Sequence, residues 1–137
     1  MHHSTERLDV SGAYFFSLAD MIGWTAVGSF CLVFVVGLSP ESTTYTVLIA
    51  TLLATISHAN LKTPWLLGFL IQRPESHSIH HQRDVHAYNY SSLPLIDMLF
   101  GTFKNPREFA KDTGFYIGAS NRMLEMLLFK NIEKPKK

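Results

Sequence analysis

The sequence predicts an all-α integral membrane protein, in which a two-helix transmembrane hairpin carries a cytoplasmic helical cap rich in histidine. Two observations lead to this fold class. Two uncharged runs of twenty residues follow one another in the first half of the chain, and five of the seven histidines stand in two tight clusters. We expect one domain, residues 1–137, with an interfacial segment at 1–20, the hairpin at 21–61 and the cap at 62–137.

Charge is scarce and unevenly placed. Charged residues make up 17% of the chain, against about 25% in an ordinary soluble domain. Residues 1–72 hold only two basic and four acidic residues, whereas residues 73–137 hold ten basic and seven acidic residues. The apolar first half excludes disorder there and argues against a uniformly charged soluble globule.

Two classes of function are excluded by composition. The formal net charge of +1 supplies no concentrated basic face, so we expect no nucleic-acid partner. Cys31 is the single cysteine, which rules out both a disulfide framework and a cysteine-based zinc ribbon.

The first membrane helix is predicted within residues 21–40 and the second within residues 42–61, because neither run contains a charged residue. About twenty apolar residues are needed to cross a hydrocarbon core of roughly 30 Å. The second run is less apolar, since it contains threonines and His58. A short turn is predicted at residues 39–42, with Pro40 ending the first helix. Two buried helices of a soluble α protein remain the alternative.

A hairpin would bring both ends of the chain to one side of the membrane. All twelve lysines and arginines would lie there, and none lies in the turn at 39–42. The positive-inside rule makes that side cytoplasmic, so we expect a multi-pass protein with its histidine clusters on the cytoplasmic face.

Three shorter apolar segments remain. Residues 8–20 are too short to span and suit a helix lying in the membrane interface. Residues 63–72 either continue the second helix past Pro64 or lie at the interface. Residues 119–130 suggest an amphipathic closing helix.

The histidines provide the chemistry. His77, His80 and His81 stand at i, i+3 and i+4 and would share one helix face, with Pro74 and Glu75 in its first turn. The hairpin would bring the remaining candidates, His2, His3 and His58, to the same face. Neutral imidazole binds iron, zinc and copper, and a cysteine-free site suits redox iron or catalytic zinc better than structural zinc. Two simpler interpretations stay open: His86 as an ordinary surface residue, and His2 and His3 as a frayed terminus.

A family resemblance rests on these motifs. Residues 74–81 (PESHSIHH), then Asn89-Tyr90, then residues 97–103 (DMLFGTF) resemble the last histidine box and following segment of the fatty acid hydroxylase/sterol desaturase superfamily of membrane di-iron oxygenases. His2-His3-Ser4 is similar to the end of that family's middle box. His58-Ala59-Asn60 is similar to its histidine-asparagine pair at the end of a membrane helix.

The resemblance implies an iron-dependent oxidation of lipid. Family members use two irons and O₂ to hydroxylate or desaturate a C–H bond of a membrane lipid, with electrons from a cytochrome b5- or ferredoxin-type donor. It implies iron ligands at His2, His3, His58, His77, His80 and His81. Residues that would orient the ligands are His86, Asn89, Tyr90 and Asp97, and no catalytic residue is identified beyond these.

Departures from the family pattern lead us to expect an incomplete copy, the C-terminal part of such a domain. The middle box would begin before Met1, and the first box has no counterpart. Ser91 and Ile96 stand where relatives usually have Gly and Trp. Three hypotheses follow: a fragment or mis-started copy of a di-iron lipid hydroxylase, a short membrane protein that binds one metal ion such as zinc, or a structural membrane protein with decayed histidine boxes.

Overall fold

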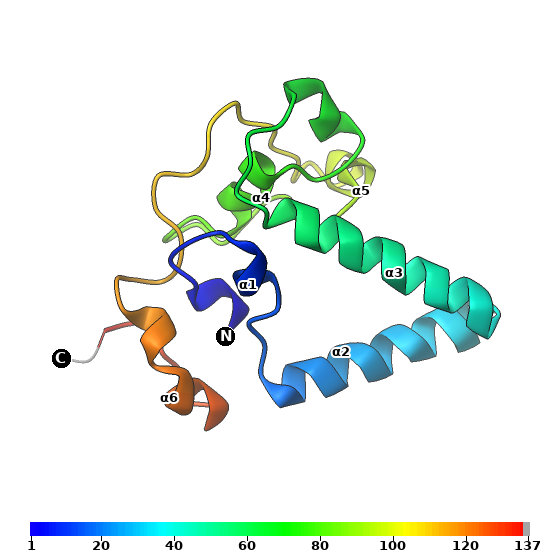
Figure 1. Cartoon of the computed structure of the whole chain (residues 1–137), viewed down its shortest axis with the longest axis horizontal. Coiled ribbons are helices and arrows are strands. Elements are labelled where there is room, and N and C mark those ends of the chain that lie inside the picture. Colours follow the sequence, from blue (N-terminus) through cyan, green and yellow to red (C-terminus); the bar gives the residue numbers. More distant parts are fainter. Residues whose placement is uncertain (136–137) are drawn as a thin grey trace.

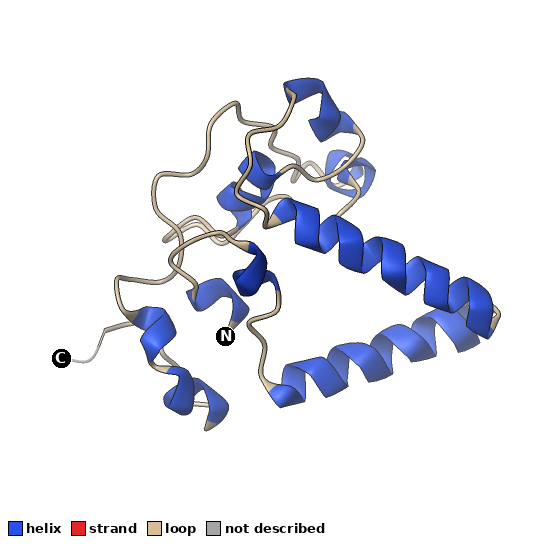
Figure 2. Cartoon of the chain, in the orientation of Figure 1, coloured by secondary structure: helices blue, strands red, loops and turns tan. Residues whose placement is uncertain are grey.

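The structure, a computed structural model, describes residues 1–135 and is helical (Figures 1 and 2). Among these residues no strand forms, and the only β-type pairing is an isolated bridge between Gln82 and Thr113. The predicted all-α class is therefore confirmed for the described part of the chain. Residues 136–137 lie outside the described part.

The first long helix is α2, Leu18–Phe30, which continues as a π-helical stretch η2, Cys31–Val35. Its start is fixed by a capping box, in which Ser17 Oγ accepts from the Asp20 N–H at 3.1 Å and the Asp20 carboxylate accepts from the Ser17 N–H. Leu18–Val35 has a mean hydropathy of 1.8 and none of it is buried. Among the described residues this is the one helical stretch long and apolar enough to cross a membrane.

The second long helix is α3, Pro40–Ser57. Figure 1 shows α2 and α3 running in opposite directions, joined at the end far from the other elements. The prediction that Pro40 ends the first helix is wrong: that helix ends at Val35, the chain turns through Gly37 (φ +79°), and Pro40 begins α3. Proline suits the first helical position because the N–H that it lacks would have no partner there. That α3 also crosses a bilayer stays a prediction.

None of the three shorter apolar segments forms one continuous α-helix. Residues 8–20 form only α1, Val10–Ala13, because the capping box at Ser17 starts a new helix. Residues 63–72 neither continue α3 nor form an α-helix: they hold a 3₁₀ turn, η3, Trp65–Phe69. Residues 119–130 divide into the 3₁₀ turn η4, Ala119–Asn121, and α6, Met123–Leu127.

The cap contains α4, Pro74–His80, and α5, Pro94–Leu99, each with proline at its first position. The predicted helix start at Pro74 and Glu75 is thus confirmed. A buried polar network holds this start: Arg73 Nη1 donates to the Thr63 carbonyl at 3.0 Å, and Glu75 accepts from the Thr63 N–H at 2.7 Å. Arg73 and Glu75 also form an ion pair at 3.7 Å. Buried charges are tolerated only when paired and hydrogen-bonded in this way.

Asn105 joins this network to η3. Its side chain accepts from Arg73 Nε at 3.1 Å and donates to the Trp65 carbonyl at 3.1 Å. A Cβ added at Gly68 would lie 2.6 Å from Asn105 Cγ. We therefore expect Gly68→Ala to lower the free energy of unfolding by about 1–3 kcal/mol, the usual cost of overpacking, measured by thermal unfolding in detergent.

Gly23 offers the matched control, because a Cβ there would meet nothing within 4 Å. Gly23→Ala is expected to leave the unfolding temperature unchanged within a degree or two. Equal unfolding temperatures for the two variants would contradict the tight packing at Gly68.

Candidate metal centre

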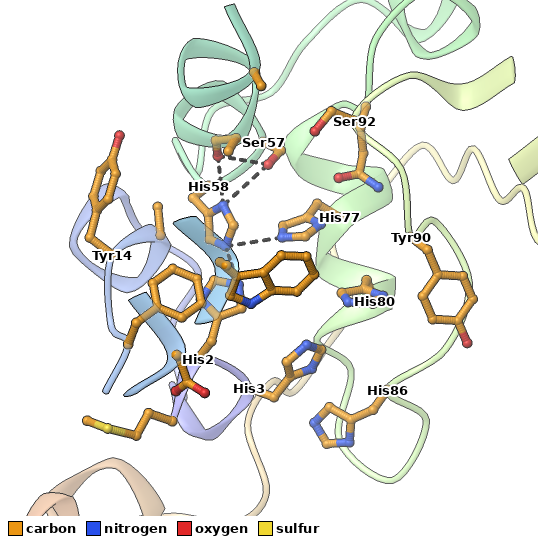
Figure 3. Close-up of a pocket in the computed structure, with 18 of the residues that line it drawn as sticks. His2, His3, Tyr14, Ser57, His58, His77, His80, His86, Tyr90 and Ser92 are labelled. Atoms are coloured by element: carbon orange, nitrogen blue, oxygen red, sulfur yellow. Dashed lines mark hydrogen bonds between the residues drawn. The ribbon is translucent and has the colours of Figure 1, made fainter. Parts of the chain in front are cut away.

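Four histidines from three separate segments meet at one end of α3, and Figure 3 shows three of them, His2, His58 and His77. One nitrogen from each of His2, His58, His77 and His81 lies within 4.8 Å of the others. The 3₁₀ turn η1, His2–Ser4, supplies the first of them. His58 caps the C-terminus of α3, while His77 and the residue after α4, His81, come from the cap.

The spacing of these nitrogens suits a single metal ion. The Nε2 atoms of His58 and His77 are 3.1 Å apart, those of His77 and His81 are also 3.1 Å apart, and those of His58 and His2 are 3.3 Å apart. Nitrogens at 2.0–2.1 Å from a tetrahedral ion stand about 3.3–3.4 Å from one another. These three separations are close to the tetrahedral value, and all four nitrogens lie within 4.8 Å of one another.

Backbone carbonyls orient three of the rings. Facing carbonyls lie close to Nδ1 of His2 (Gly12 O, 3.0 Å), His58 (Ala54 O, 2.8 Å) and His80 (Tyr88 O, 2.8 Å). An Nδ1–H that donates to a carbonyl leaves the Nε2 lone pair free for a metal. The sequence does not predict these partners, because every residue has a backbone carbonyl and residue type does not show which one will face a histidine. Only Ala54 could have been found, since it stands one helical turn before His58.

His77 and His81 have no such partner. Their Nδ1 atoms are buried and make no hydrogen bond within the described residues. A buried polar atom without a partner is costly. These Nδ1 atoms point away from the converging Nε2 atoms, so the four-histidine cluster does not account for them.

His3, His80 and His86 form a second group beside the first. The His3 ring centroid lies 4.7 Å from that of His80 and 5.4 Å from that of His86. It also stacks on His81 at 4.6 Å, which joins the two groups. Nε2 of His86 is buried without a hydrogen-bond partner among the described residues. The six histidines expected to bind metal are thus all at this centre, but they divide into four and two.

The other three residues expected to orient ligands hold the loop around them. Asp97 accepts from the backbone N–H groups of Tyr90 and Ser91, both at 2.9 Å. The Tyr90 ring lies 5.3 Å from that of His80. Asn89 is buried, and its Nδ2 donates to the Ser76 carbonyl of α4 at 2.7 Å. Asp97 therefore fixes the backbone at Tyr90, and Asn89 fixes its loop against α4.

Burial keeps the imidazoles neutral. Desolvation, followed by the nearby His58, lowers the pKa of His2 to about 4. Desolvation, followed by His80, lowers the pKa of His3 to about 3. The pKa values of His77 and His81 are lowered in the same direction, chiefly by burial. At neutral pH these side chains present unprotonated nitrogens, the form that binds a metal.

A cavity of about 1290 Å³ opens from the histidines toward the two long helices. His2, His58 and His77 line it at one end, while Trp24 of α2 and Ala50 of α3 line it further away. The remaining walls of α3 are formed by Val47, Thr51 and Ala54. The arrangement places a candidate metal centre beside a cavity whose walls on α3 are mainly apolar, while charged Asp20, Asp84, Glu133 and Lys134 also line it. The cavity is larger than the roughly 300–1,000 Å³ of ordinary ligand pockets, so it has room for a small-molecule or lipid ligand.

Gly114 fixes the position of η1 beside the site. It has φ +80°, and its N–H donates to the His81 carbonyl at 3.2 Å. A Cβ there would lie 2.9 Å from the carbonyl oxygen of Thr5, directly after η1. We expect Gly114→Ala to displace His2 and His3 and to weaken metal binding by 10-fold or more, measured by competition with a chelator.

The control for this variant is Gly118→Ala. Gly118 also has a positive φ, +90°, but a Cβ there would meet nothing within 4 Å. Both substitutions carry the backbone strain of about 1–2 kcal/mol, so only the contact with η1 differs. Metal affinity that falls equally in both variants would refute the role of Gly114 in placing η1.

Comparison with known proteins gives the family. The sequence model of the fatty acid hydroxylase family matches residues 1–102, which contain all seven histidines and both long helices. No curated protein and no solved structure matches the chain. Since the match covers well over half of its residues, the chain belongs to the fatty acid hydroxylase family.

Proposed function

We propose that this chain carries the metal centre and the lipid-binding cavity of an O₂-dependent lipid hydroxylase or desaturase. The observation that carries the proposal is the four-histidine cluster at the head of a cavity walled by α2 and α3. Membership of a family of oxidoreductases supports the reaction class.

The proposed metal is iron, held at two positions. His2, His58, His77 and His81 would hold the first, because their nitrogens have the required spacing. His3 and His80 would hold the second, with the unpartnered Nε2 of His86 beside them. Iron bound there supplies the redox chemistry by which O₂ oxidises an unactivated C–H bond. A single zinc ion in the four-histidine cluster is the second candidate, because the same spacing suits zinc.

The chain's own contribution is to bind and orient the lipid. Trp24 and Ala50 would contact the acyl chain, and the neutral histidines at the cavity head would face the bond to be oxidised. The fully exposed apolar surface of α2 supports a position in the membrane. We propose that α3 also crosses it, with the histidines at the cytoplasmic face, since the connection at residues 36–39 lacks lysine and arginine.

An acidic electron carrier completes the proposal. The histidine side of the molecule carries basic residues of the cap, including exposed Lys111 and Lys134. This charge would attract an acidic cytochrome b5- or ferredoxin-type donor and raise its association rate.

The test is lipid oxidation by the purified chain. The iron-loaded chain, in nanodiscs of mixed phospholipid, is supplied with a reduced ferredoxin and ¹⁸O₂, and the acyl chains are analysed by mass spectrometry. We expect a hydroxylated product carrying ¹⁸O, or a new double bond without it. Iron-loaded protein that leaves the lipids unchanged would contradict the proposal, and one bound zinc without oxidation would favour the second candidate.

A further inference from the structure

An uncharged apolar surface stands beside the cavity on two short elements, η3 and α5. Its most exposed side chains are Leu66 and Leu70 at or next to η3, 71% and 70% exposed, and Leu99 and Phe100 at the end of α5, 73% and 80% exposed. Residues 64–72 and 91–103 contain one charged residue, Asp97, which is buried and bonded to backbone N–H groups. We name this the η3–α5 surface.

The local folding turns these apolar side chains outward. The inner side of η3 is Gly68, against Asn105, and the inner side of α5 is formed by Pro94 and Asp97. Polar bonds therefore hold both elements to the cap, and Leu66, Leu70 and Leu99 remain largely exposed among the described residues. Contiguous exposed patches of large apolar side chains are rare on monomeric soluble proteins and mark a contact with another apolar phase.

Two polar residues, Gln72 and Ser92, connect the η3–α5 surface to the wall of the cavity. The Gln72 N–H donates to the Ser92 carbonyl at 2.9 Å, which ties the end of the η3 segment to the start of α5. The side chains of Gln72 and Ser92 line the same cavity as Ala54 of α3. The segments that carry the surface therefore reach the cavity through Gln72 and Ser92, and Figure 1 shows α5 near the C-terminal end of α3.

Cationic and aromatic side chains border the surface. Exposed Lys104 lies over the Tyr88 ring at 4.8 Å, and exposed Arg107 lies over the Trp65 ring at 5.1 Å. Aromatic rings together with lysine or arginine are enriched where a protein meets the headgroup region of a bilayer.

We propose that the η3–α5 surface lies in the bilayer interface, with its leucines and Phe100 among the acyl chains and Lys104 and Arg107 at the headgroups. The occupant is the lipid of the leaflet next to the metal centre, and this contact holds the cavity mouth at the depth of the lipid tails. The inference rests on the membrane location within the proposed function. It adds a second membrane contact, separate from the spanning helices.

Spin labels test this depth directly. Cys31→Ser removes the single cysteine, so Leu99→Cys or Leu70→Cys then carries one label. The full chain is placed in nanodiscs of phosphatidylcholine and phosphatidylglycerol, and relaxation by O₂, which concentrates in the bilayer, is compared with relaxation by a water-soluble nickel chelate. We expect O₂ to dominate at both leucine positions and the chelate to dominate at Lys111→Cys, a charged exposed control.

Two further measurements distinguish failure of the η3–α5 proposal from failure of the membrane location. A label at Phe34→Cys on η2, the continuation of α2, reports whether the chain spans the bilayer at all, since Phe34 is exposed there. O₂ dominance at Phe34 with chelate dominance at Leu99 overturns the η3–α5 proposal alone, and chelate dominance at both overturns the membrane location as well. Dipolar broadening between Leu99 labels would show a second copy on this surface, and that too would overturn the proposal.

Discussion

Replacing His77 by alanine is expected to lower metal affinity by more than about 100-fold. Removing a residue that only orients a metal ligand costs about 10- to 100-fold, and the loss of a ligand itself should be larger. Nε2 of His77 lies 3.1 Å from Nε2 of both His58 and His81, so it stands at the middle of the four-histidine cluster. Its loss leaves three ligands and an unfilled position between them. Metal content after purification and competition with a chelator would measure the change.

His86→Ala is the matched control. His86 lies beside His3 but outside the four-histidine cluster, so we expect that cluster to keep its affinity within 10-fold. Circular dichroism would show that both variants keep their helices. A His77→Ala protein that binds metal as tightly as the unsubstituted chain would exclude the cluster as the binding site.

Ala50→Phe is expected to reduce lipid oxidation at least 10-fold, about 1.4 kcal/mol in the activation free energy, while metal content stays unchanged. Ala50 lines the cavity on α3, and a phenyl ring there would occupy the space assigned to the acyl chain. None of the four clustered histidines is changed by this substitution, so we expect the metal site to keep its geometry. Product formation per bound iron would be compared between variants.

Leu52→Phe provides the control for this substitution. Leu52 lies on the same helix, is exposed, and is not among the residues that line the cavity. Its replacement should leave turnover within 2-fold. Equal turnover in all three proteins would show that the acyl chain does not pass Ala50.

Sequence spacing predicted the centre of the site well because a helix imposes its own periodicity. Pro74 begins α4 as expected, and His77 and His81, one turn apart, face each other. The same reasoning placed His80 with them, and its ring does stack on that of His77 with centroids 5.3 Å apart. It nevertheless lies outside the four-nitrogen cluster, with its Nδ1 against the Tyr88 carbonyl and its ring also beside His3. That difference arises in the loop after α4, where Tyr88 and Asn89 have positive φ, and no periodic pattern encodes such a loop.

Other features depended on contacts between distant segments. The orienting carbonyls of Gly12 and Tyr88 carry no sequence signal, and the pairing of Arg73 with Thr63 and Asn105 joins residues that no spacing rule connects. Helix ends were predicted least accurately. Local capping decided them, through Ser17 at the start of α2 and Pro40 at the start of α3.

The iron content of the purified chain tests the central claim most directly. Protein produced with excess iron would be analysed for all transition metals, and X-ray absorption would count the nitrogen ligands around each. We predict close to two irons per chain, bound mainly by imidazole nitrogen at about 2.0–2.2 Å, near the metal–imidazole distance known for zinc. One zinc per chain with no iron, or no bound metal at all, would contradict it.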